Sequence, residues 1–481
     1  MPDTEGGGPR PTAAVLLAAG EGKRMCSGLP KVMHPIGGVT LLGHAAAAVS
    51  ALLPEHLAVV VGHGREQVSS EVEALGKQLG RPVVTAVQEQ QLGTGHAVMC
   101  GEKELAGLGE RLVVFYGDCP LIRAATLEQL LALQTQSAST CSLATTDLAD
   151  PTGYGRVLRD ANGDVSAIVE QKAATPAQLA VREINAGVYS FDAAAFWKHI
   201  HDVRPDNPAR EYYLTDIAGI FIRAGLRVTA LKIEDASELL GINNRVELAE
   251  ADRILRQRKA RELMLDGVTI ERPETVAIDS GVRIGMDTIV SAFARITGRT
   301  VIGENCRIGA SAIIEDCEIG DNVEIFPFSI LSESRVDAGA HAGPFSRVRM
   351  GAHVETGAHV GNFVELKKTR FGAGSKSMHL AYLGDANIGR TVNIGAGTIT
   401  CNYDGEKKHQ TTIGEGAFVG SNSTLVAPVE IAGGSYIAAG SVITDDVPPN
   451  SLALGRARQV VKEGWKKRQK SPASSGTPVA P

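Results

Sequence analysis

The sequence predicts an α/β domain with a mostly parallel, Rossmann-like sheet, followed by a parallel β-helix. In the first half, apolar strand-like runs alternate with helical patterns, which favours a parallel sheet covered on both faces. In the second half, aliphatic residues recur every six positions, a spacing that fits neither a helix nor an ordinary strand. Aromatic residues are only 4% of the 481 residues while glycine numbers 54, a balance typical of a repetitive β region.

The first-half elements follow from these patterns. Strands are expected at residues 13–19, 56–61, 83–87 and 112–116, and helices at 41–53 and 65–79. Ligands of such sheets bind at the carboxyl ends of the strands. We therefore expect a site where the first strand enters a Gly-rich loop and where the fourth ends in Gly117-Asp118.

Residues 245–266 predict a long, solvated linking helix. The segment is crowded with charge, lacks Gly and Pro, and stops at Gly267. The expected domains are thus a first domain at 12–244, this linker, and a β-helix at 267–456. The tails at 1–11 and 457–481 complete the chain, and the first tail and the end of the second, from Lys470, are expected to be disordered.

Three ladders of aliphatic residues carry the β-helix prediction. Each six-residue unit would form one short strand and a corner, three units would form one coil, and the aliphatic side chain would point inward. A chance β-rich domain is the alternative, but three ladders of six or more members argue against it. The ladders predict roughly nine coils of 18 residues. Their members are Ile278, Ile284, Val290, Ile296, Ile302, Ile308 and Ile314; Val336, Ala342, Val348, Val354, Val360 and Leu366; and Ile413, Val419, Leu425, Ile431, Ile437 and Ile443.

Composition narrows the function classes. A formal charge of −6 gives no reason to expect a nucleic-acid partner. Seven cysteines without a Cys-x-x-Cys pair argue against a disulfide framework or a zinc site and fit a reducing, cytoplasmic setting. The N-terminus has no signal-peptide pattern, and no apolar run is long enough to span a membrane.

The loop after the first strand can face a phosphate. It reads Leu17-Ala18-Ala19-Gly20-Glu21-Gly22-Lys23-Arg24-Met25, and Pro30-Lys31 follow. Its glycines let backbone N–H groups point at an anion, and its basic side chains add charge. It is neither a dinucleotide fingerprint, since Met25 replaces the third glycine, nor a Walker A loop.

With its downstream motifs, this half resembles the sugar-phosphate nucleotidylyltransferases. The matching segments, besides the loop, are Gln91–His96, Tyr116–Asp118, Pro151–Arg156, Ile168–Glu170, Glu183–Asn185 and Gly241–Arg245. In the implied reaction a sugar-phosphate oxygen attacks the α-phosphorus of a nucleoside triphosphate. Because both reactants are anions, positive charge must bring them together.

The resemblance implies a role for each matching residue. Asp118 and Asn243 would be the oxygen ligands of Mg²⁺, and Arg24 and Lys31 would be the catalytic cations that hold the triphosphate. The substrate site would comprise Gln88, Gly93 and Thr94 at the uracil; Gly155, Glu170 and Asn185 at the sugar; and Leu17, Ala18, Ala19, Gly20, Tyr116 and Gly117 around them.

The six-residue ladder breaks in two places. Residues 371–384 and 400–412 are out of phase and polar, so we expect loops there that carry function. His379 lies in the first break, and an imidazole suits removal of a proton from an amine as it attacks.

These segments are similar to the acetyltransferase half of the bacterial bifunctional N-acetylglucosamine-1-phosphate uridylyltransferases/glucosamine-1-phosphate N-acetyltransferases, and the resemblance runs from about Val15 to Arg456. It implies a left-handed β-helix, as in other hexapeptide-repeat proteins, and a homotrimer whose acetyl sites are shared between neighbouring coils. The coil would acetylate glucosamine 1-phosphate with acetyl-CoA. The first domain would then transfer uridylyl from UTP to N-acetylglucosamine 1-phosphate, releasing pyrophosphate.

The same resemblance assigns the acetyl site. His379 would be the general base, while Arg349 and Lys367 would hold the sugar phosphate. The remaining contacts would be Tyr382 and Asn393 at the sugar, and Ala396, Asn402, Tyr403, Ser421, Ala439 and Arg456 at acetyl-CoA.

Three residues depart from the family pattern, and two rival functions remain. Lys23 stands where Thr is usual, Ala186 where Thr is usual, and Cys119 where Val is common. One rival is a nucleotidylyltransferase with a repeat tail that makes ADP-glucose, GDP-mannose or dTDP-glucose, which would lack the His379 and Asn402-Tyr403 set. The other is a non-enzymatic guanine-exchange subunit of translation initiation, which would not need intact metal and phosphate ligands.

Overall fold

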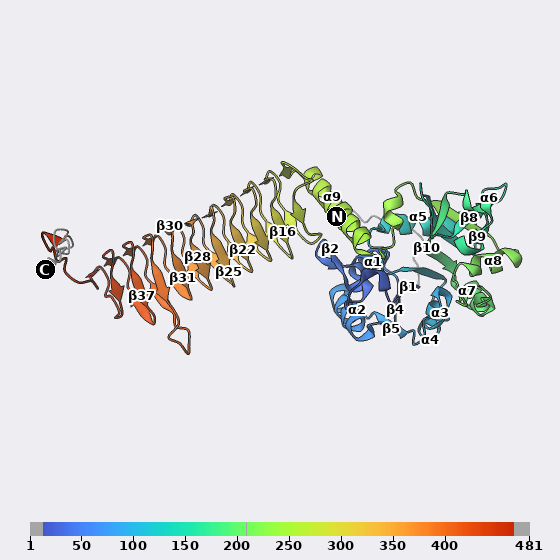
Figure 1. Cartoon of the computed structure of the whole chain (residues 1–481), viewed down its shortest axis with the longest axis horizontal. Helices are drawn as coiled ribbons and strands as arrows, with labels where there is room; N and C mark the ends of the chain where they lie inside the picture. The colour runs from blue at the N-terminus through green and yellow to red at the C-terminus, as the bar shows by residue number, and fades with distance from the viewer. Residues whose placement is uncertain (1–12, 208, 466–481) are drawn as a thin grey trace, which may run out of the picture. The chain divides into compact units, whose positions relative to one another are not determined.

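The computed structural model describes residues 13–207 and 209–465 (Figure 1). The tails predicted to be disordered, 1–11 and 470–481, lie outside the described residues. Contacts between residues divide the chain into two compact units. One is Met1–Lys259 with Ile278–Ser280, and the other is Ala260–Ala277 with Gly281–Pro481.

The first unit is built on a mixed sheet. Its main path runs β11-β7-β10-β6-β1-β4-β5, and β8 and β9 form a hairpin that joins β10. The strands are β1 (Ala13–Ala18), β4 (His56–Val61), β5 (Val84–Val87), β6 (Arg111–Tyr116), β7 (Cys141–Asp147), β8 (Arg156–Arg159), β9 (Val165–Val169), β10 (Glu183–Asp192) and β11 (Val228–Lys232). The two-residue strands β2 (Pro35–Ile36) and β3 (Val39–Thr40) pair separately.

The four predicted strands pair in parallel, β6 with β1, β1 with β4, and β4 with β5. Strand β10 differs, because it runs antiparallel to both β6 and β7 and inserts between them. The sheet is thus mostly parallel on the side that carries the Gly-rich loop.

Helices cover both faces of this sheet (Figure 1). Alternate residues of β1 enter two different cores: Val15 and Leu17 join one, and Leu16 and Ala18 join the other. This alternation explains why the strand is apolar throughout. The helices are α1 (Leu41–Ser50), α2 (Arg65–Leu79), α3 (Thr94–Met99), α4 (Glu102–Leu105), α5 (Ala124–Ser137), α6 (Pro176–Leu179), α7 (Ala193–His199) and α8 (Asp216–Arg223).

The predicted linking helix is α9 (Arg245–Leu265). It ends two residues before Gly267, whose φ of +95° an L side chain rarely adopts. Across the part of the chain that the structure describes, no helix is both long and apolar enough to cross a membrane.

The second unit is a left-handed parallel β-helix of the hexapeptide class. Its strands of two to four residues run from β12 (Thr269–Ile270) to β41 (Leu452–Ala453). Within the described residues they form three parallel sheets of eleven, ten and nine strands, close to the nine coils predicted. Every member of the three predicted ladders is buried.

The coil period is less regular than predicted. Ile284 pairs with Ile302, eighteen residues on, but Ile302 pairs with Ile319, seventeen residues on. Corners that are one residue shorter shift the phase between the first two ladders. Between the second and third ladders a longer connection adds to this shift, because Ile388 pairs with Ile413, twenty-five residues on.

The two expected breaks differ in structure. The expectation of a loop at residues 371–384 is wrong, because β29 (Arg370–Phe371), β30 (Lys376–His379) and β31 (Tyr382–Gly384) stay in the coil. Phe371, Ser377 and Leu383 point inward there and are fully buried. The second break does leave the coil, between β34 (Ile399–Cys401) and β35 (Thr411–Ile413).

Candidate functional sites

A cavity of about 650 Å³ lies at the carboxyl ends of β1 and β6 in the first unit. Every residue that the sequence assigned to uridylyl transfer lines it, except Gly117. Gly117 instead donates its N–H to the carbonyl of Leu17 at 2.9 Å, and so ties the ends of the two strands together. The lining includes Leu17, Ala18, Ala19, Gly20, Arg24, Lys31, Gln88, Gly93, Thr94, Tyr116, Asp118, Gly155, Glu170, Asn185 and Asn243.

Asp118 and Asn243 converge on one cation. The ammonium of Lys31 contacts the carboxylate of Asp118 and lies 3.4 Å from Oδ1 of Asn243, and the Lys31 and Asp118 side chains are mostly buried. Two oxygens that meet a single ammonium are close enough to share a metal ion, and both are of the type that Mg²⁺ prefers. The residues present therefore fit the predicted Mg²⁺ site. Among the described residues, no cluster of three or more His, Cys, Asp or Glu offers another metal site.

Arg24 is exposed on the short 3₁₀ turn Lys23–Met25. Arg245, at the start of α9, holds this turn by donating to the carbonyl of Met25 at 3.3 Å. Lys23 forms an exposed ion pair with Glu21 at 2.6 Å, so the charge that this departure adds is already partnered within the loop.

The expected uracil end of the cavity is held by buried polar contacts. Gln88 is 4% exposed, and its amide donates to the carbonyl of Gly93 at 3.0 Å. Gly93 has a φ of +108°, and a Cβ there would meet the backbone of Tyr212. Thr94 accepts the N–H of Leu214 at 3.0 Å. These contacts fix the positions of Gln88 and Thr94 before any ligand binds.

The expected sugar end centres on β10. The side chain of Asn185 donates to the Tyr189 hydroxyl at 2.7 Å and accepts the N–H of Gly187 at 3.2 Å. Gly187 has a φ of +75°, and a Cβ would enter the ring of Tyr116. Glu170 accepts a hydrogen bond from Thr215 at 3.1 Å. Ala186, one of the three departures, also lines the cavity.

Cys119 follows Asp118 and is 1% exposed. Burial, with the neighbouring Asp118 carboxylate, raises the pKa of its thiol well above the ordinary value. The thiol therefore stays protonated and unreactive at neutral pH, which fits a packing role.

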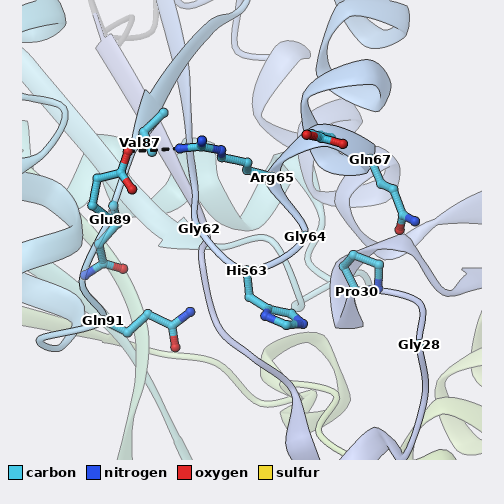
Figure 2. A pocket seen from close by; sticks show the side chains of 12 residues that line it. Gly28, Pro30, Gly62, His63, Gly64, Arg65, Gln67, Val87, Glu89 and Gln91 are labelled. Carbon is cyan, nitrogen blue, oxygen red and sulfur yellow. Dashed lines mark hydrogen bonds and ion pairs between the residues drawn. The ribbon is translucent and has the colours of Figure 1, made fainter.

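A second cavity, of about 520 Å³, shares Gln88 and Gln91 with the first (Figure 2). Figure 2 shows Arg65, at the start of α2, bonded to Glu89 across it, at 2.9 Å. Gln91 lines both cavities and donates to the carbonyl of Ala19 at 2.8 Å. Its lining carries one arginine, Arg65, and two glutamates, Glu66 and Glu89, so this cavity has no excess of positive charge that would favour an anion.

In the second unit four of the predicted acetyl-site residues, His379, Ala396, Ser421 and Ala439, occupy one corner of successive coils. Asn362 in β27 (His359–Asn362) pairs in register with His379 in β30. Following the same register through β33 (Asn393–Ile394), β36 (Phe418–Val419) and β39 (Tyr436–Ile437) places Ala396, Ser421 and Ala439 at the next three levels. We call the residues 362, 379, 396, 421 and 439 the corner column.

Backbone hydrogen bonds confirm the spacing of the corner column. The N–H of Asn422 donates to the carbonyl of Ala396 at 2.7 Å, and that of Gly440 donates to Ser421 at 2.8 Å. Arg456 donates to the carbonyl of Ala439 at 2.6 Å, which brings the last predicted acetyl-CoA residue to the same corner. Residues spread over 78 positions of sequence thus form a continuous row.

His379 is exposed and oriented by one contact. Its Nδ1 lies 2.7 Å from Oδ1 of Asn362, and a carbonyl oxygen can only accept. Nδ1 therefore carries the proton in the neutral ring, which leaves the Nε2 lone pair available as a base. The sequence assigned no role to Asn362, because its partner His379 lies seventeen residues further along the chain and only the fold brings the two together.

The predicted phosphate-binding residues lie in β25 (Arg347–Arg349) and β28 (Glu365–Lys367). Arg349 and Lys367 are register partners on neighbouring strands. Glu365 orients Arg349 with a bond at 2.7 Å, and Asp385 accepts from Lys367 at 3.2 Å. The contact with Lys367 lowers the pKa of Lys408, a lysine that the sequence argument missed.

Tyr382 and Asn402 meet over Gly384. A Cβ on Gly384 would collide with both the Tyr382 hydroxyl and the Asn402 amide. Asn402 also donates to Asp385, so Lys367 and Asn402 share this one carboxylate. Asn393 begins the next strand of the sheet that carries His379. Asp385 and Gly384 gave no signal in the sequence, since they act through neighbours in the fold.

Residues 14–175 match the model of the MobA-like NTP transferase domain, and residues 299–332 and 410–445 match the bacterial transferase hexapeptide model (six repeats). The chain is 54% identical over 468 residues to the bifunctional protein GlmU of Solibacter usitatus, covering 97% of this chain and 99% of that protein. It is 49% identical to GlmU of Anaeromyxobacter sp. (97% and 95% covered) and 46% identical to GlmU of Pelobacter propionicus (95% and 98% covered).

Proposed function

We infer the roles of the site residues and the assembly of this protein from its family. The chain belongs to the family of bifunctional GlmU proteins, which it matches over nearly its whole length. The chain is a bifunctional transferase of UDP-N-acetylglucosamine synthesis. Its hexapeptide coil acetylates glucosamine 1-phosphate with acetyl-CoA. Its first domain then transfers uridylyl from UTP to N-acetylglucosamine 1-phosphate and releases pyrophosphate. The gathering of two separate sets of candidate residues on one chain, in the first-unit cavity and along the corner column, supports this conclusion.

For acetyl transfer, His379 is the general base. As the amine of glucosamine 1-phosphate attacks the thioester carbonyl, Nε2 takes the amine proton and the thiolate of CoA leaves. The Asn362 carbonyl stabilises the protonated ring through Nδ1. Arg349 and Lys367 bind the sugar phosphate dianion, and Tyr382 and Asn393 bind the sugar. The column residues Ala396, Ser421 and Ala439, with Asn402, Tyr403 and Arg456, bind acetyl-CoA.

For uridylyl transfer, the side chains bring two anions together and stabilise the developing charge. Arg24 and Lys31 bind the triphosphate, Gln88, Gly93 and Thr94 bind the uracil, and Gly155, Glu170 and Asn185 bind the sugar. Asp118 and Asn243 would hold Mg²⁺, which supplies positive charge at the phosphates when bound. The contacts of the Lys31 ammonium with the oxygens of both Asp118 and Asn243 support this proposal.

We further propose a homotrimer, supported by an apolar ridge beside the corner column. Phe328, Phe345 and Phe363 stack on one another at centroid distances of 5.1 and 5.3 Å, and each is about half exposed. Leu380 continues the ridge and is 61% exposed. A row of exposed aromatic rings favours burial against another copy. Phe363 and Leu380 directly follow Asn362 and His379, so such a contact would place the acetyl site between copies.

The protein is proposed to act in the cytoplasm on small-molecule substrates, in line with seven cysteines that are all free. A nucleotide-preference assay tests the uridylyl assignment. With N-acetylglucosamine 1-phosphate and Mg²⁺, we expect pyrophosphate release with UTP to exceed that with ATP, GTP or dTTP by at least about tenfold in kcat/KM. Equal or better use of another nucleotide would reject uridylyl transfer in favour of the rival sugar-nucleotide syntheses.

A further inference from the structure

The hairpin at residues 402–409 is the feature that the mechanism above leaves without an explanation. In the preceding coil one residue, Asp385, connects the second and third sheets, between β31 and β32 (Ala386–Ile388). In the next coil nine residues, 402–410, make the same connection between β34 and β35. The inserted segment projects from the coil as the loop seen near β37 in Figure 1.

Apolar packing does not hold this hairpin. Of residues 402–410 only Asn402 is buried, at 7% exposed, and Tyr403 is 59% exposed. The two arms meet through an antiparallel bridge between Tyr403 and Lys408, and through the N–H of His409, which donates to the carbonyl of Asn402 at 2.8 Å. Its shape must therefore depend on polar contacts.

Asp404 supplies most of those contacts. Its Oδ1 accepts the N–H groups of Glu406 at 2.8 Å and Lys407 at 2.6 Å, which closes the turn. Its Oδ2 lies 2.6 Å from Nε2 of His409, which joins the two arms. The backbone N–H of Lys407, followed by the ring of His409, holds the pKa of Asp404 well below its ordinary value. Asp404 is thus ionised at neutral pH, when it can bind all three donors.

We propose that Asp404 and His409 are positioning residues for acetyl transfer, because the hydrogen bond between their side chains closes the hairpin and thereby places Asn402 and Tyr403 for acetyl-CoA. The inference rests on the proposed function, which gives Asn402 and Tyr403 that ligand. Two contacts fix the position of Asn402. Its carbonyl accepts the N–H of His409 in the opposite arm of the hairpin, and its side-chain amide donates to Asp385 in the coil. Among the described residues, Tyr403 has no side-chain hydrogen bond that links it to the coil in this way. Its hydroxyl turns back to the carbonyl of Gly405, within the hairpin itself.

Steady-state acetyl-transfer kinetics of the full-length protein test this inference. We expect Asp404→Ala to raise the KM for acetyl-CoA about tenfold, the scale of a lost charged hydrogen-bond network. His409→Ala is expected to raise it by a smaller factor, whereas His409→Gln keeps an N–H donor and should restore much of the loss. In all three variants kcat and the KM for glucosamine 1-phosphate should stay within about twofold of wild type.

The coil offers a matched control. His353 and Asp337 form a second surface His–Asp pair, at 2.8 Å, on β26 (His353–Val354) and after β23 (Arg335–Val336), away from the corner column. His353→Ala should leave the KM for acetyl-CoA unchanged. Uridylyl transfer by the same preparations reports whether the rest of the chain is intact.

The inference is overturned if Asp404→Ala and His409→Ala keep the wild-type KM for acetyl-CoA, or if His353→Ala has an equal effect. It is also overturned if kcat falls while that KM does not move. Should Asp404→Ala prevent folding of the coil, the comparison of His409→Ala with His409→Gln decides alone. Wild-type protein that does not acetylate glucosamine 1-phosphate would instead reject the proposed function.

Discussion

At the scale of single residues, each site combines one reactive group with a neighbour that fixes its state. Asn362 accepts from Nδ1 of His379 and so leaves the Nε2 lone pair available for the proposed role as base. Asp118 and Asn243 face the same ammonium of Lys31, which gives both of these partly buried polar groups a partner. Neighbours of this kind explain why the reactive residues alone do not describe either site.

The two sites predict a reciprocal pair of variants. His379→Ala should lower kcat for acetyl transfer by about 10²- to 10⁴-fold, the usual contribution of a general base, and leave uridylyl transfer unchanged. Asp118→Ala should abolish uridylyl transfer and spare acetylation. Separate assays of both reactions on both variants measure this. Loss of both activities in a variant whose circular dichroism matches wild type would contradict two independent sites.

Metal removal should separate the reactions in the same way. Asp118 and Asn243, the proposed Mg²⁺ ligands, lie in the first unit. The acetyl transfer proposed for the coil uses His379 as the base and involves no metal ion. We expect EDTA to stop uridylyl transfer and added Mg²⁺ to restore it, while acetyl transfer continues. A chelator that inhibits both reactions equally would contradict the assignment of the metal to uridylyl transfer alone.

At the scale of elements, the sequence predicted the parallel strands and the coil well. His56–Val61 and Arg65–Leu79 have the predicted bounds, because each is a clear apolar or amphipathic run that ends at turn residues. The pattern did not reveal that β10 runs antiparallel, since burial on both faces hides strand direction. It also misread residues 371–384 as a loop, because a corner shortened by one residue shifts the ladder without leaving the coil.

The candidate sites were predictable only in part. Residues within matching motifs, such as Asp118 and His379, carry their own signal. Gly384 and Asp385 do not, because their importance arises from Tyr382, Asn402 and Lys367, which only the coil brings to them. The corner column likewise depends on the register between successive coils. Six-residue spacing alone does not fix this register, because the nine residues 402–410 interrupt the spacing between Ala396 and Ser421.

The aromatic ridge predicts how the coil assembles. Phe345→Glu would place a charge in the centre of the ridge, between Phe328 and Phe363. We expect this variant to sediment or elute as a monomer and to lose acetyl transfer at least about tenfold, because burying an unpaired carboxylate is costly. Uridylyl transfer should be retained. Ile313→Glu, on a partly exposed strand position, is the control for added charge. An unchanged oligomeric state in Phe345→Glu would contradict the assignment of this ridge to the trimer contact.

At the scale of the whole molecule, two architectures on one chain serve two chemistries. The mixed sheet gathers the loops proposed to bind phosphate at strand ends, and the coil repeats one corner at successive levels, where the proposed acetyl-CoA residues lie. The order along the chain is the reverse of the order of reaction, since the second domain makes the substrate of the first. N-acetylglucosamine 1-phosphate, the product of the coil, keeps the sugar phosphate that the first domain requires in its substrate.

One measurement tests this account most directly. The purified chain is mixed with glucosamine 1-phosphate, acetyl-CoA, UTP and Mg²⁺, and products are followed by mass spectrometry over time. We predict that N-acetylglucosamine 1-phosphate appears first and that UDP-N-acetylglucosamine follows with an equal amount of pyrophosphate. Formation of UDP-glucosamine before any acetylated sugar, or no UDP-N-acetylglucosamine at all, would contradict the account.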